Sequence, residues 1–186
     1  MEPTQRTRPL VAWTRGLEEA SALDGPVRAM EPTIQQIFGQ GARGSMLRGD
    51  WLGHALHPSL TDLVLGTWTS ATILDLFGGA ESSRPAQRLI ATGLLAAGPT
   101  AWTGWAEWSA AGARDKRVGL VHAVTNGLAI SMYAASWLAR RRGRQGSGTG
   151  LALAGAAVSA AGGYLGGHLA LARKVGSHDA RFDQTS

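Results

Sequence analysis

The stretch VGLVHAVTNGLAISMYAASWLA, residues 118–139, contains no charged side chain. A helix that crosses a bilayer needs about 20 such residues, whereas a helix of a soluble bundle keeps a charged face towards water. Residues 147–172 form a second stretch of this kind, uncharged apart from His168. Both stretches therefore predict helices that cross a membrane.

Two less apolar stretches precede them and predict further spans. One is uncharged until Glu107, near its end, and the other has only twelve uncharged residues between Asp62 and Asp75. The connections are short, so neighbouring helices should run antiparallel. The chain is thus expected to be all-α, with a four-helix transmembrane bundle over residues 51–176. The expected spans cover residues 59–79, 89–108, 118–139 and 147–172.

Residues 1–50 are expected to form an amphipathic helical region ahead of the bundle. Apolar residues recur there at helical spacing in two runs, separated by a break at residues 23–26, LDGP. They predict two short helices that lie on the membrane surface or pack on the end of the bundle. Residues 39–50 are expected to be a linker and residues 177–186 a polar tail. No apolar run before residue 50 is long enough for a signal peptide.

Composition excludes several classes of function. The chain has no cysteine, which excludes disulfides, thiolate metal sites, iron–sulfur ligation by this chain and a cysteine nucleophile. Its net charge of +5 comes from 16 Arg and 2 Lys, and the arginines lie in short clusters between apolar runs. Such clusters flank membrane spans and do not form the basic stripe of a nucleic-acid-binding protein. The lipid bilayer is therefore the expected partner, and nucleic acid is not.

The distribution of basic residues also bears on orientation. Lysine and arginine are more numerous on the side of the bundle that holds both termini. Because basic residues concentrate on the cytoplasmic side of membrane proteins, both termini are expected in the cytoplasm. The sequence thus predicts a multi-pass protein of the plasma membrane.

Ionisable side chains are expected to gather at one rim of the bundle. Antiparallel threading brings the starts of the first and third spans to the same side as the ends of the second and fourth. An ionisable group in lipid is costly and usually faces the bundle interior with a partner, so a cluster of them predicts a site. The candidate members are His54, His57, Asp62, Glu107, His122 and His168.

Several kinds of chemistry fit these residues, and the sequence leaves them open. Histidines from different helices can hold a haem b through two axial imidazoles, which would make the chain a redox or cofactor-binding subunit with an electron-transfer partner protein. The candidate haem ligands are His57, His122, His168 and His54. A divalent metal ion is the second alternative. Its candidate ligands are His57, His122, His168, Glu107 and Asp62.

Two further alternatives need no metal. Imidazole titrates near neutral pH, so the same histidines suit a proton relay or a quinone pocket. They can also serve a structural or scaffolding membrane protein, in which they only tie helices together by hydrogen bonds. The sequence has no evident pair of nucleophile and base, so it does not decide whether the chain is an enzyme.

Four motifs, in order along the chain, carry a resemblance to a known family. They are GHALHP at residues 53–58, TGWAEW at 103–108, RVGLVH at 117–122 and GGYLGGH at 162–168. Together they resemble domain-of-unknown-function family 2231, a bacterial family of four-span membrane proteins. The chain departs from the family pattern at Ala55, where a proline is usual, and at Glu107, where an aspartate is usual. Some relatives are joined to a Rieske-type iron–sulfur domain, so the resemblance implies a redox role.

Overall fold

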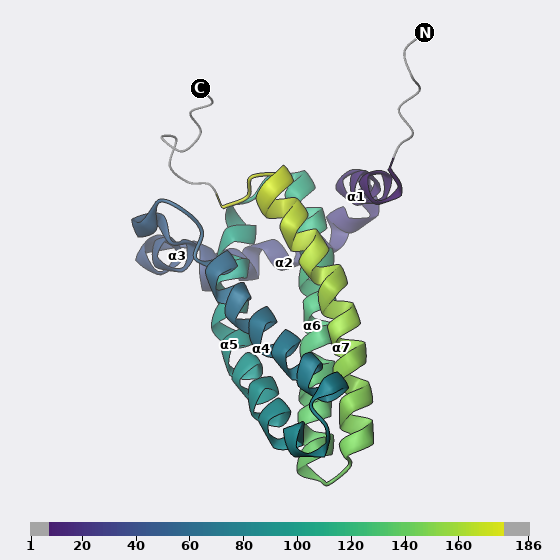
Figure 1. The fold of residues 1–186 in the computed structure, drawn as a ribbon. Helices are drawn as coiled ribbons and strands as arrows, with labels where there is room; N and C mark the ends of the chain where they lie inside the picture. Colours follow the sequence, from purple (N-terminus) through teal and green to yellow (C-terminus); the bar gives the residue numbers. More distant parts are fainter. Residues whose placement is uncertain (1–7, 177–186) are drawn as a thin grey trace, which may run out of the picture.

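A computed structural model describes residues 8–176, and every regular element in this range is a helix. The expected all-α class is therefore confirmed, while the polar tail expected at residues 177–186 lies outside the described residues. Four long helices lie side by side in an elongated bundle (Figure 1). They are α4 (His57–Phe77), α5 (Ser83–Ala110), α6 (Ala113–Arg141) and α7 (Gln145–Gly167), which continues as the π-helical turn η5 (His168–Ala172).

The bundle consists of two helical hairpins, α4–α5 and α6–α7. Within each hairpin the two helices pack on each other more extensively than on any helix of the other hairpin. α4 ends at Gly78, and Gly79 turns the chain towards α5 with a positive φ of 69°, which L side chains rarely adopt. Between the hairpins, the rings of Trp68 and Tyr133 stack with their centroids 4.0 Å apart. The two hairpins therefore share one hydrophobic core.

Two helices of the described part, Ala113–Arg141 and Gln145–Ala172, are long and apolar enough to cross a membrane. They contain the spans expected at residues 118–139 and 147–172. α4 and α5 do not reach this level of hydropathy, because α4 carries two aspartates and the uncharged part of α5 contains several Gly, Thr and Trp residues and Pro99. The described residues thus show two apolar helices, and the four-span arrangement stays a prediction.

Three short helices lie near one end of the bundle (Figure 1). They are α1 (Pro9–Glu19), α2 (Asp24–Ile34) and α3 (Gly41–Arg48). The two helices expected from the amphipathic runs are confirmed as α1 and α2, which contact α6, and α2 also contacts α5. The linker expected at residues 39–50 is wrong, because α3 forms there and packs on α5. A Cβ atom on Gly44 would collide with the carbonyl of Gly39, so glycine here permits close packing and does not indicate flexibility.

Candidate functional site

His57 lies in the first turn of α4 and reaches across to the backbone of α5. Its Nδ1 is 2.8 Å from the carbonyl oxygen of Thr100. Because a carbonyl only accepts hydrogen bonds, Nδ1 carries the ring proton and Nε2 presents a lone pair. The ring rests on Gly104, where an added Cβ would lie 2.8 Å from Cε1 of the imidazole. The absence of a side chain at Gly104 therefore makes the room that His57 occupies.

His122 of α6 has the same arrangement against α7. Its Nδ1 is 2.9 Å from the carbonyl oxygen of Gly162, so this ring too has its proton on Nδ1. The ring rests on Gly166, where an added Cβ would lie 2.9 Å from Cε1. One difference is Asn126, whose side-chain Nδ2 lies 2.9 Å from Nε2 of His122 and donates to it. In each hairpin, a histidine of the first helix is thus held by a carbonyl four residues before the glycine that accommodates it.

The two imidazole rings lie close together, in an edge-on arrangement, between the two hairpins. Their centroids are 6.2 Å apart, and their planes are nearly perpendicular at 82°. A cavity of about 350 Å³ opens beside them and is lined mainly by small or apolar residues. The small residues of the lining include Ala101, Gly104, Gly119, Ala123, Gly127 and Gly166. Such a lining leaves mainly apolar space next to the two rings.

Two acidic residues line the same cavity. Glu107 of α5 is buried, and the carboxylate of Asp115, near the start of α6, accepts a hydrogen bond of 2.7 Å from Nε of Arg173. Of the six residues predicted from the sequence, the structure therefore brings together His57, His122 and Glu107.

The other three predicted residues lie elsewhere. His168 begins the π-helical turn after α7, and its Nε2 is 2.7 Å from Oε1 of Glu18 in α1. His54 is exposed, with Nδ1 3.1 Å from the carbonyl of Ala55, and Asp62 is exposed on α4. Within residues 8–176 no group of three or more His, Cys, Asp or Glu is placed to hold a metal ion.

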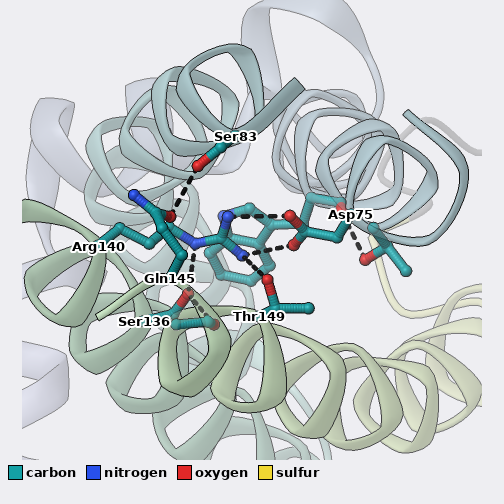
Figure 2. Close-up of polar contacts among 9 residues, drawn as sticks. Asp75, Ser83, Ser136, Arg140, Gln145 and Thr149 are labelled. Atoms are coloured by element: carbon teal, nitrogen blue, oxygen red, sulfur yellow. Dashed lines mark hydrogen bonds and ion pairs between the residues drawn. The ribbon is translucent and has the colours of Figure 1, made fainter. Parts of the chain in front are cut away.

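A buried ion pair at the opposite end of the bundle was missed by the sequence reasoning (Figure 2). Arg140 of α6 donates to both oxygens of Asp75 in α4, at 2.9 and 2.5 Å. The two side chains are only 1% and 3% exposed. Ser136 and Thr149 add hydrogen bonds to the same guanidinium, both 3.3 Å long. The sequence signal for this pair is an aspartate near the end of α4 and a run of arginines at the same end of α6, which runs in the same direction.

Ion pairs also hold the N-terminal helices to the start of α6. Arg117 donates to both oxygens of Asp24, at 2.7 and 2.9 Å, and Lys116 pairs with Glu31. Hydrogen bonding from Arg117 lowers the pKa of Asp24 from its ordinary value. With the link between Glu18 and His168, these contacts attach α1 and α2 to both helices of the second hairpin.

All regular elements of residues 8–176 are helices, and two of these helices are long and apolar enough to cross a bilayer. The chain belongs to the predicted membrane protein family DUF2231, whose sequence model matches residues 53–179. The resemblance drawn from the four motifs is therefore confirmed, and the match covers the four long helices with both facing histidines. Membership in this family associates the chain with a lipid bilayer. Comparisons with curated proteins and with solved structures give no match.

Proposed function

We propose that this chain is a four-span membrane protein that binds one haem between His57 and His122 and serves as a redox subunit for a partner protein. The observation that carries the proposal is the pair of facing imidazoles, each with Nδ1 tied to a backbone carbonyl. Metal-ligating histidines commonly donate their other ring N–H to such a carbonyl, which fixes the tautomer and the ring orientation. Both rings thus have the protonation state that a metal ligand needs.

The separation of the rings supports coordination of one ion by both. Two metal–nitrogen bonds of about 2.0 Å, plus the distance from each nitrogen to its ring centre, place the centroids about 6 Å apart. The observed centroid distance is 6.2 Å. Among the described residues, Nε2 of His57 has no hydrogen-bond partner, whereas Nε2 of His122 would have to exchange Asn126 for the ion.

Two protein nitrogens favour haem over a bare divalent ion. A structural zinc site takes four ligands from the protein, and the two facing histidines supply only two. A porphyrin brings four nitrogens of its own and needs only axial ligands and apolar space, and the lining of the cavity is mainly apolar. The cavity of about 350 Å³ lies at the lower end of the range of about 300–1,000 Å³ for ligand pockets. Haem held by two imidazoles supplies electron transfer.

The four-span arrangement rests on helix length and on the neutralised charge of Asp75. At about 1.5 Å per residue, the 21 residues of α4 span about 31 Å and the 28 residues of α5 about 42 Å. Both exceed the hydrocarbon thickness of about 30 Å. The pairing of Asp75 with Arg140 lowers the cost of placing this aspartate of α4 in a bilayer. Both termini would then lie on the cytoplasmic side of the plasma membrane.

A scaffold is the second candidate, and one observation favours it. His122 is already hydrogen-bonded at both ring nitrogens, to Gly162 and to Asn126, so it ties α6 to α7 without any ligand. If the chain is a scaffold, the rings of His57 and His122 lie close together only because their helices pack against each other. The two candidates differ in whether the purified protein absorbs visible light.

The test is an absorption spectrum of the protein purified in mild detergent, before and after titration with haem. We expect a Soret band that is lost in the variants His57→Ala and His122→Ala. His168→Ala and His54→Ala are matched controls, since neither histidine faces the pair, and both should retain the band. Circular dichroism would show that each variant is still helical. A helical protein that stays colourless after haem titration would refute the proposal and favour the scaffold.

A further inference from the structure

The first helices of the two hairpins carry inward-packed residues of matching kinds in the same order. His57, Trp68 and Asp75 of α4 correspond to His122, Tyr133 and Arg140 of α6, each pair being 65 positions apart in the chain. In every pair the two side chains contact or face each other: imidazole with imidazole, indole with phenol ring, carboxylate with guanidinium. Two further pairs at this offset, Val64 with Ala129 and Ala71 with Ser136, are buried on both sides.

The second helices repeat in the same way, at an offset of 62 positions. Gly104 and Gly166 accommodate the two histidines, and the carbonyls of Thr100 and Gly162 accept from them. Gly93 and Gly155 likewise leave room for the stacked rings of Trp68 and Tyr133. A Cβ atom on Gly93 would meet the indole of Trp68, and one on Gly155 would lie 3.1 Å from the ring of Tyr133. The buried positions of α5 from Ala86 to Ala97 match those of α7 from Gly148 to Ser159.

Helical periodicity alone does not explain this agreement. Periodicity makes buried positions recur every three or four residues, but it does not specify which side chain meets which glycine or carbonyl. We infer that α4–α5 and α6–α7 are two copies of one helical hairpin, related by a two-fold axis that passes between the members of each pair. α4 and α6 run in the same direction, so the axis lies along the bundle, as for parallel repeats in membrane proteins.

The symmetry assigns a role to the pair of Asp75 and Arg140. If two copies of α4–α5 packed together, they would bury two carboxylates against each other. Two copies of α6–α7 would bury two guanidiniums in the same way. Burial of like charges is strongly unfavourable, whereas the observed pair is bidentate and almost fully buried. The opposite charges therefore favour packing of α4–α5 against α6–α7 over packing of either hairpin against a copy of itself. This surface is the recognition site between the two halves of the chain.

Two small residues complete the recognition site. Gly148 leaves room for the longer side chain, since an added Cβ would lie 2.5 Å from Cγ of Arg140. The matching residue of the first hairpin, 62 positions earlier, is Ala86, beside the shorter aspartate in the symmetric arrangement. An exchange of the two charges between the halves thus also needs an exchange of alanine and glycine.

The first test exchanges the charges in the full chain and follows thermal unfolding in detergent. We expect Asp75→Arg and Arg140→Asp, each alone, to lower the melting temperature by about 10 °C or to prevent folding, because each buries two like charges. The quadruple variant Asp75→Arg, Ala86→Gly, Arg140→Asp, Gly148→Ala should recover most of the loss. A quadruple variant no more stable than the single variants would overturn the inference.

A second exchange tests the symmetry without moving a charge. Trp68→Tyr leaves a void and Tyr133→Trp overfills its site, so each alone should lower the melting temperature by several degrees, on the order of 5 °C. The double variant should unfold close to the parent protein if the two positions are equivalent, and failure of this rescue would also overturn the inference. Neither readout requires haem, so rescue in a colourless protein would refute haem binding and leave the duplication intact.

Discussion

Alanine substitution should destabilise the protein at the two glycines that contact the histidines. At other glycines of the same helices it should be neutral or stabilising. In Gly104→Ala the new Cβ would lie 2.8 Å from Cε1 of His57, and in Gly166→Ala 2.9 Å from Cε1 of His122. Carbon atoms pack best about 3.5–4.0 Å apart, so each ring must move by about 0.6 Å or more. Such overpacking costs about 1–3 kcal/mol, against which the better helix propensity of alanine returns at most about 1 kcal/mol.

Matched controls lie in the same two helices. Gly98 of α5 and Gly163 of α7 have nothing within 4 Å of an added Cβ. Gly98→Ala and Gly163→Ala should therefore be neutral or stabilising by up to about 1 kcal/mol. For a chain of this size, 1 kcal/mol corresponds to about 2–4 °C in melting temperature, so the two classes should separate by several degrees in thermal unfolding followed by circular dichroism.

The same variants probe haem binding. Displacement of either ring strains the hydrogen bond that fixes Nδ1, and a loss of about 1.4 kcal/mol in binding free energy is a tenfold loss of haem affinity. Gly104→Ala and Gly166→Ala should lose at least about this much, and the controls should bind as the parent does. Equal melting temperatures for Gly104→Ala and Gly98→Ala would refute the reasoning, because they would mean that His57 does not rest on Gly104.

Two further predictions concern the membrane arrangement and the N-terminal helices. The chain has no cysteine, so single cysteines at the exposed positions Glu81, Arg142 and Ala113 can be labelled selectively in intact cells. If the chain has four spans, Glu81→Cys and Arg142→Cys should react from one side of the membrane and Ala113→Cys from the other. Reaction of Glu81→Cys and Ala113→Cys from the same side would contradict the four-span arrangement. The pKa of Asp24 is lowered in the folded protein, so the stabilisation from its pair with Arg117 is fully present above pH 3.8, the ordinary pKa of aspartate. This stabilisation is lost as pH falls through the lower pKa of the folded state. Hydrogen exchange in α2 should therefore rise at the lowest pH in the parent, whereas Asp24→Asn should exchange faster already at neutral pH and lack this pH step.

The four-helix core could be predicted from the sequence to the extent that it depends on local composition. Absence of charge over one long stretch was enough to predict α6, and α7 followed in the same way. His57 and His122 were predicted because antiparallel helices bring ionisable residues to one rim of the bundle, where they need partners. Those partners turned out to be backbone carbonyls of Thr100 and Gly162, which no side-chain motif reveals.

The remaining differences arise from contacts between distant parts of the chain. His168 was grouped with the other histidines by its level along the bundle, but the rotation of its helix directs it to Glu18, 150 residues earlier. Asp75 counted against a membrane span in the sequence, because its neutralisation by Arg140 depends on a residue 65 positions later. α3 was missed because glycine signals a flexible linker locally, and only its packing against α5 makes the helix favourable.

The ion pairs between the N-terminal helices and the second hairpin determine the order in which the chain can assemble during synthesis. α1 and α2 leave the ribosome first, yet Asp24 must wait for a residue 93 positions later, and Glu18 for one 150 positions later. Contacts between such distant residues form late, because the intervening chain must be in place first. Full docking of α1 therefore has to follow the synthesis of α7, whereas α2 can dock as soon as the start of α6 has been made.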